Sequence, residues 1–145
     1  MMSAMAATDA PHLQTLPLRL HPGDDLRRAL EAAVSARGLS AAFVVSGIGS
    51  LRPAQVRLAG AQRPTTIDSD CELLTLAGSI AGDGSHLHLS VSDSDGRVIG
   101  GHAGYGCIVR TTAEVLLALL PAWHFSREAD PATGWAELAI SPARR

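Results

Sequence analysis

Residues 86–102 of this chain, HLHLSVSDSDGRVIGGH, combine strict alternation with a turn signal and leave few choices of local structure. Successive side chains of a strand point to opposite faces. His86, His88 and the two serines after them therefore share one face, and Leu87 and the next apolar residues line the other. The Ser-Asp-Gly triplet at 94–96 favours a tight turn. The segment predicts a β-hairpin whose apolar face points to the core and whose opposite face carries histidines.

The length of the turn decides whether a third histidine, His102, joins the first two. A two-residue turn at 95–96 pairs position 89 with His102 and sends this imidazole to the apolar face. A three-residue turn at 94–96, with its glycine in the left-handed conformation, pairs His88 with His102 directly. Three-residue turns that end in glycine are common, so we expect the three imidazoles to converge.

Three imidazoles on one face of a hairpin suit zinc or a similar divalent metal ion. Zn²⁺ accepts nitrogen ligands, and in open sites it keeps a further coordination position for water or a substrate. The candidate ligands are His86, His88 and His102. The alternative is a solvated polar strand face on which histidines merely alternate with leucines, because the pattern lacks the fixed spacing of a zinc finger.

One amphipathic helix is expected early in the chain, within residues 21–38. Apolar residues from Leu26 to Val34 recur at the spacing of one helix face. Asp24 can cap the start of this helix, and Gly38 suits its end. Short strand-like runs precede and follow it, so the sequence predicts an α+β fold with a mostly antiparallel β-sheet.

The chain length is enough for one hydrophobic core and hardly for two, so one domain is expected. We place this domain at 15–141, with a flexible N-terminal tail at 1–14 and a short C-terminal tail at 142–145. The segment CIVRTTAEVLLALLP at 107–121 fits either a helix or a strand. Its Ala, Glu and Leu residues favour a helix, whereas the strands before it favour another strand.

Charge and composition argue against nucleic-acid and membrane partners. The basic residues are all arginine, and a net charge of −2 gives no general attraction to a phosphate backbone. The start of the chain lacks a basic and then apolar signal, and no run reaches the ~18 apolar residues of a membrane span. The two cysteines lack C-x-x-C spacing, which fits a reducing compartment. We therefore expect a cytoplasmic protein without a membrane partner.

Other chemistry-bearing residues give weaker signals. Glu114 could be an outer-shell partner of a metal ligand or a general base, although a lone glutamate after two threonines is more often a surface residue. The glycines of SGIGS have the wrong order for a phosphate-binding loop, and the chain has no lysine to follow them. No recognisable motif places a nucleophile or an acid–base pair, so the catalytic residues are unknown and the sequence leans away from an enzyme.

Five blocks, taken in order, carry a family resemblance: SGIGSLRPAQVRLAG, CELLTLAGSI, HLHLSVSDSDGRVIGGH, GCIVRTTAEVLLALLP and FSREADPATGWAEL. Their most specific parts are the block H-x-H-x-S…D-G-x-V-x-G-G-H and the later D-P-x-T-G followed by E-L. With these blocks the chain resembles the PPC domain, whose name stands for plants and prokaryotes conserved. The similarity covers nearly the whole chain, residues 15 to 140.

This resemblance implies a compact α+β domain with a mostly antiparallel sheet that assembles as a homotrimer, and it would make 107–121 a strand. Prokaryotic members are stand-alone domains. Those that keep the three histidines are similar to metal binders, which assigns the ligand role to His86, His88 and His102. Plant members carry the domain beside AT-hook DNA-binding motifs, so the resemblance also implies a DNA-binding label. An AT hook needs Arg-Gly-Arg-Pro to enter the minor groove, and the nearest match, QRPT at 62–65, lacks it.

Three functions follow from these observations. The first is a homotrimeric, prokaryotic-type domain that binds a divalent metal ion, zinc, as its cofactor. The second is a DNA-associated regulatory or oligomerisation scaffold, for which Arg52, Arg57 and Arg63 could form a basic cluster. The third is a metal-dependent enzyme of unknown substrate, in which the ion activates water or polarises a carbonyl group.

Overall fold

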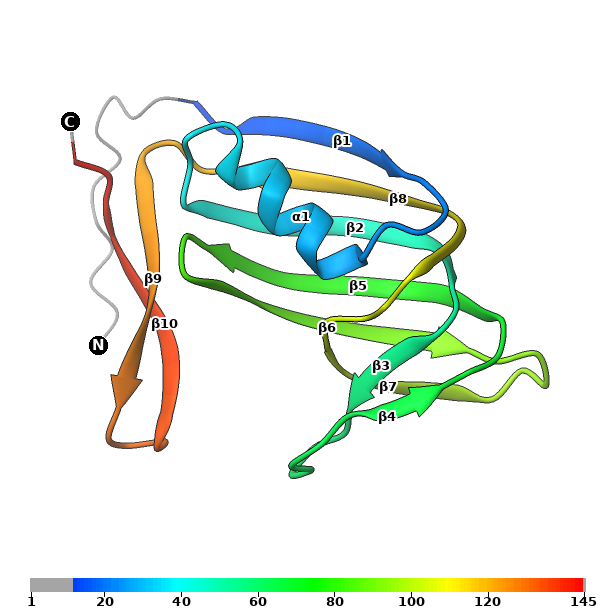
Figure 1. Ribbon diagram of the computed structural model, residues 1–145. Coiled ribbons are helices and arrows are strands. Elements are labelled where there is room, and N and C mark those ends of the chain that lie inside the picture. Colours follow the sequence, from blue (N-terminus) through cyan, green and yellow to red (C-terminus); the bar gives the residue numbers. More distant parts are fainter. Residues whose placement is uncertain (1–11, 145) are drawn as a thin grey trace.

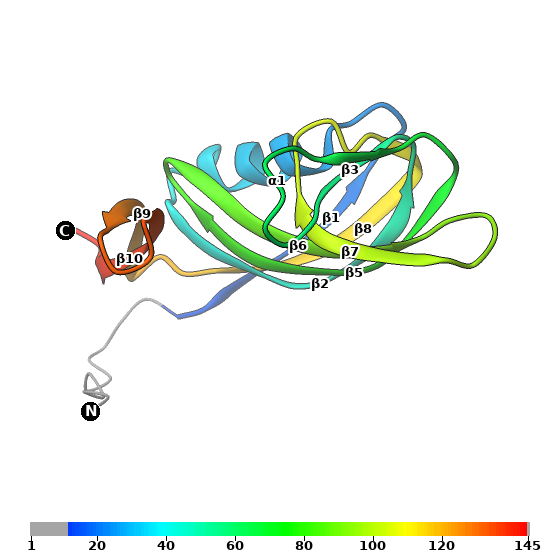
Figure 2. The ribbon, with the colours of Figure 1, turned by 90° about the horizontal axis from the view of Figure 1, so that it is seen from below.

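The computed structural model describes residues 12–144, which form a curved eight-stranded sheet, a helix on one side of it and a separate two-stranded hairpin (Figures 1 and 2). The sheet order is β1-β8-β2-β5-β6-β7-β3-β4, and all strand pairings among these residues are antiparallel. The sheet strands are β1 (Gln14–Leu20), β2 (Ala41–Leu51), β3 (Ala54–Arg57), β4 (Thr65–Ile67), β5 (Cys71–Ala81), β6 (Gly84–Ser92), β7 (Val98–Ala103) and β8 (Val109–Leu119). The hairpin consists of β9 (Trp123–Asp130) and β10 (Trp135–Pro142). The predicted α+β class with a mostly antiparallel sheet and one helix is confirmed.

Helix α1 spans Leu26–Ser35, within the predicted segment. The prediction that Asp24 caps this helix is wrong. The cap is Asp25, whose carboxylate accepts the backbone N–H of Arg28 at 3.2 Å. Asp24 instead accepts the backbone N–H of His21 at 2.8 Å in the preceding turn. Adjacent aspartates satisfy different backbone donors here, and sequence alone does not distinguish them.

The core lies between α1 and one face of the sheet. Leu26, Leu30 and Val34 of the helix are at most 2% exposed, because they recur on a single helix face. Strand β6 contributes Leu87 and Leu89 to the same cluster, as its alternation predicts. The apolar face of the predicted hairpin is therefore the core face.

Replacing Leu30 by alanine is expected to lower the free energy of unfolding by about 2–5 kcal/mol, because it leaves a cavity in a closely packed core. Leu30 is 0% exposed, so water cannot readily fill the space that the smaller side chain leaves. Urea unfolding at one protein concentration measures the effect. Ala32→Ser, on the exposed side of the same helix, is the control and should cost about 0.5 kcal/mol. Equal losses in the two variants would contradict this account of the core.

The ambiguous segment at 107–121 forms strand β8 rather than a helix. It lies between β1 and β2 and pairs with both of them (Figure 1). Its buried residues alternate with more exposed ones, from buried Ala113 through exposed Glu114 to buried Val115. Pairing on both sides outweighs the helix propensity of its Ala, Glu and Leu residues.

The expected tails lie at the margins of the described residues. Residues 1–11 of the predicted tail, and position 145, lie outside them, whereas Gln14 already belongs to β1. No helix within 12–144 is long and apolar enough to cross a bilayer.

Candidate metal centre

The turn between β6 and β7 has the three-residue form that brings the histidines together. Asp93 and Arg97 close it, with the Asp93 N–H donating to the Arg97 carbonyl at 2.9 Å. Gly96 has a φ angle of +79°, the left-handed conformation that glycine adopts at little cost. His88 consequently lies directly opposite His102. The predicted register is confirmed.

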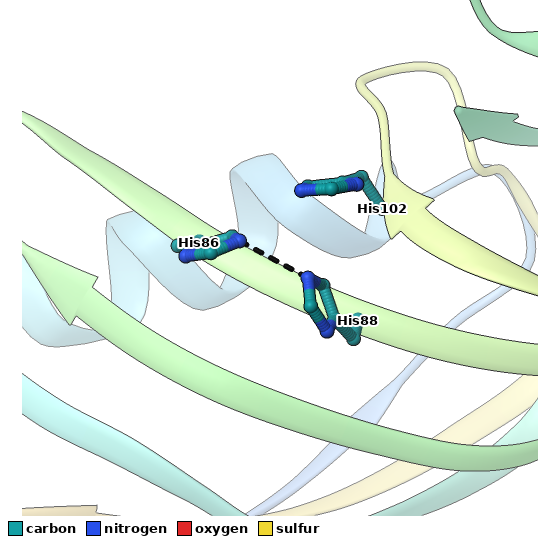
Figure 3. Close-up of side chains that lie close together, drawn as sticks. All are labelled: His86, His88 and His102. Atoms are coloured by element: carbon teal, nitrogen blue, oxygen red, sulfur yellow. Dashed lines mark hydrogen bonds between the residues drawn. The ribbon is translucent and has the colours of Figure 1, made fainter. Parts of the chain in front are cut away.

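The three imidazoles form one cluster on the sheet face opposite α1 (Figure 3). Nε2 of His88 and Nε2 of His86 lie 3.0 Å apart, within hydrogen-bond distance. His102 approaches from the neighbouring strand, and its ring centroid lies 4.6 Å from that of His88 and 5.1 Å from that of His86. One nitrogen from each ring can be chosen so that all three lie within 4.8 Å of one another.

Arg27 of α1 fixes the backbone at both histidine strands. Its guanidinium donates to the Ser85 carbonyl at 2.7 Å and to the Ala103 carbonyl at 3.3 Å. Ser85 precedes His86 in β6, and Ala103 follows His102 in β7. The helix therefore holds the start of β6 and the end of β7, the two strands that carry the histidines, through one side chain.

Strand β3 supports His102 from its other side. Arg57 of β3 pairs with His102 in antiparallel register. Gly101 permits this approach, because a Cβ atom there would lie 2.5 Å from the Arg57 carbonyl oxygen. The glycine before His102 is thus required by the close passage of a neighbouring backbone.

The surroundings favour the neutral form of His86 and His102. Burial lowers the pKa of His86, and the positive charges of His88 and Arg127 lower it further, while Glu137 opposes them. Burial also lowers the pKa of His102, with Arg57 as the next largest cause. A metal ion binds the neutral ring, so these shifts reduce competition from protons at neutral pH.

In the metal-free protein, we expect NMR titration to give midpoints for His86 and His102 below the ordinary value of 6.5. The unfolded chain then binds more protons than the folded chain around that pH. The contribution to stability is therefore complete above pH 6.5, and it is lost as the pH falls through the lowered folded-state pKa values. Unfolding in urea at several pH values measures this loss. Midpoints at or above 6.5 would contradict the predicted direction.

The donor set fits a divalent metal ion such as zinc. In a tetrahedral site with Zn–N bonds of about 2.0–2.1 Å, the ligand nitrogens lie about 3.3 Å apart. The Nε2 atoms of His86 and His88 are already 3.0 Å apart, and a nitrogen of His102 lies within 4.8 Å of the other two donors. Because His86 and His88 are exposed, an ion can reach these rings from solvent.

Glu114, the predicted outer-shell candidate, lies on β8 in register with Ile48 of β2 and Arg19 of β1. In the sheet order, β2 and β5 separate β8 from β6. Within one chain, Glu114 and the histidines therefore occupy different parts of the same sheet. Its outer-shell role stays a prediction.

The proposed basic cluster is divided between two places. Arg52 forms ion pairs with Asp70 at 3.1 Å and with Asp68 at 3.8 Å. Arg57, by contrast, lines a cavity beside His86.

Sequence reasoning missed the contribution of hairpin β9–β10 to this region. Arg127 of β9, together with Trp135 and Glu137 of β10, lines the same cavity as His86 and His102. The signal was present in the block FSREADPATGWAEL, which contains all three residues. Their spacing within a hairpin did not show that they face the histidines, because that depends on how the hairpin packs against the sheet.

The model of one protein family, the Plants and Prokaryotes Conserved domain, matches residues 8–121. The chain belongs to this family. The suggested resemblance to the PPC domain is therefore confirmed, and the histidine hairpin falls inside the matched region.

Solved structures share the PPC fold over nearly the full chain. A hypothetical protein from Salmonella is 39% identical, with a TM-score of 0.87, over 92% of this chain and 97% of that one. A metal-containing protein from Archaeoglobus fulgidus is 25% identical, with a TM-score of 0.78, over 93% and 99% of the two chains. A protein from Ralstonia eutropha described as a "putative DNA-binding protein" is also 25% identical, with a TM-score of 0.73, over 86% and 90%.

This PPC chain matches a segment of a longer curated protein. The bifunctional protein GlmU of a Synechococcus strain is 47% identical over 130 residues, which make up 90% of this chain. The chain spans only 21% of the length of that relative. The PPC sequence thus also occurs within a larger polypeptide.

Proposed function

We propose that this protein binds a divalent metal ion, zinc, through His86, His88 and His102. The convergence of three imidazole nitrogens within 4.8 Å of one another carries this proposal. Three imidazole nitrogen donors suit Zn²⁺, whose protein sites are commonly four-coordinate. In such a site the fourth position stays available to water or another ligand. The metal-containing Archaeoglobus neighbour, which shares the fold, adds support.

The direct test is the metal content of the full chain produced without a histidine tag. Mass spectrometry of the native protein is expected to show a stoichiometric amount of zinc. After removal of the metal, calorimetric titration with zinc should restore the same stoichiometry. Absence of metal from the purified protein, together with no uptake on titration, would overturn the proposal and leave the histidines as a polar strand face.

We also propose that the domain, residues 15–141, works as a homotrimer. The sheet face opposite α1 exposes Phe43, Val45 and Ile48 of β2, and Leu74 of the neighbouring β5. No helix or strand within residues 12–144 lies over the middle of this face (Figure 2). Exposed apolar side chains on two neighbouring strands are typical of a subunit interface. A further copy of the chain is the proposed occupant.

The DNA-associated alternative has less support from the charges of the chain. Arg52 and Arg110 both pair with Asp70, so their charges are compensated at short distance. Net charge is −2, and arginines that face a cavity do not form a track for a phosphate backbone. The DNA-binding description of the Ralstonia neighbour is thus a statement about that protein.

Two free cysteines support a cytoplasmic location as part of the proposal. Cys71 and Cys107 are both buried and unpaired. Burial is the main cause that raises the pKa of each thiol, which lowers its reactivity. Small buried thiols of this kind suit a reducing compartment.

A further inference from the structure

A cavity of about 620 Å³ lies beside the histidine cluster. One wall comes from hairpin β9–β10, another from the loop that follows β3, and His86 and His102 line the cavity between them. The volume falls within the range of about 300–1,000 Å³ that holds small molecules in proteins. The cavity can therefore admit a ligand next to the proposed metal.

Two guanidinium groups that line this cavity form no ion pair with a carboxylate in the part of the chain that the structure describes. Arg57 and Arg127 are half-buried, and within residues 12–144 neither takes part in an ion pair. Arg57 donates one hydrogen bond to the Ala61 carbonyl at 3.3 Å, and Arg127 donates one to Ser79 Oγ at 2.9 Å. Each guanidinium has five N–H donors. Further donors on both arginines thus remain available to a ligand.

Among the described residues, the other charged residues of the cavity form no ion pair with these two arginines. Arg27 also lines it, but forms an ion pair with Glu31 at 3.2 Å. Both carboxylate oxygens of Asp83 accept the backbone N–H of Arg127 at 3.0 Å. Asp83 and Glu137 are the carboxylates among the lining residues, so their charges balance those of Arg57 and Arg127 in number. A bound divalent cation would give the cavity a positive excess.

We infer that this cavity binds a small anionic molecule whose carboxylate or phosphate group is held by Arg57 and Arg127 while it reaches the open coordination position of the metal. This inference rests on the proposed metal site. Guanidinium groups recognise both oxyanions through paired N–H donors, so the structure assigns the shared chemistry rather than one of the two. The cavity lies beside His86 and His102, so an anion bound there would be next to an ion held by the histidines.

The test uses the full chain loaded with cobalt(II) in place of zinc, because its visible absorption responds to a change of ligand. Acetate and inorganic phosphate are titrated in separate experiments, and the tighter binder identifies the preferred oxyanion. We expect saturable spectral changes with at least one of them. Arg57→Gln and Arg127→Gln should each weaken that binding about ten-fold or more. Glu137→Gln should tighten it, because a nearby negative charge is removed.

Arg37→Gln is the matched control, since Arg37 is exposed, follows α1 and is absent from the cavity wall. This variant should bind the anion like the native chain. Loss of binding equal to that of Arg127→Gln would overturn the inference, as would cobalt loading with no response to either anion. In the latter case the metal proposal would stand.

A chain that takes up no metal would instead overturn the proposed metal function. The fluorescence of Trp135, which lines the cavity, then measures anion binding to the metal-free protein. Arginine-dependent quenching by acetate or phosphate would retain the anion site without the metal. No quenching would overturn both.

Discussion

His88→Ala is expected to reduce zinc binding by more than about 100-fold, because loss of an outer-shell partner alone costs about 10- to 100-fold. His88 is the central residue of the cluster, with its Nε2 atom 3.0 Å from that of His86 and its ring opposite His102. It is also exposed, so its removal leaves the core intact. Calorimetric titration of the metal-free variant measures the affinity, and circular dichroism checks the fold.

His21→Ala is the control for this variant. His21 is an exposed histidine in the turn before α1, outside the cluster. The His21→Ala variant should keep native zinc affinity. This result would distinguish the loss of a metal ligand from the loss of any histidine. Native affinity in His88→Ala would show that the metal is held elsewhere.

Val45→Asp is expected to convert a trimer into monomers. A charge placed in an apolar interface must be stripped of water without a partner, and this strongly disfavours association. Val45 is 57% exposed in the single chain, in the middle of the apolar face that we assign to the interface. Sedimentation should show the mass falling from three times 15.1 kDa to that of one chain.

Ile140→Asp tests whether the position or merely the charge matters. Ile140 is also 57% exposed but lies on β10, in the separate hairpin. This variant should remain trimeric. If the native chain already sediments as a monomer, the trimer proposal is wrong, and if both variants dissociate, the effect of the charge is not specific to the β2 face.

The register of the histidine strands was predictable because it depends on local rules. Side chains alternate along a strand, and a three-residue turn with Gly96 in the left-handed conformation sets which residues face each other. Both rules act within residues 86–102. The pairing of His88 with His102 therefore needed no knowledge of the remaining sheet.

Other features depended on contacts between distant parts of the chain. The segment around Glu114 became a strand because β1 and β2 lie on both its sides. Arg127 and Glu137 reach the cavity because their hairpin packs at the end of the sheet, where Arg127 contacts Ser79 of β5. Sequence patterns describe the hairpin but not its docking, so the anionic ligand could not be inferred from them.

The closeness of the three histidines in sequence has a consequence for the order of folding. Their hairpin is closed by a turn of a few residues, whereas the edge pairing of β1 with β8 joins Gln14 to Leu119. Contacts between residues that are near in sequence carry a smaller entropic cost of loop closure and form sooner. The hairpin is thus expected to assemble before the first and eighth strands meet. The histidine cluster that we propose as the metal site would then form before the sheet is complete.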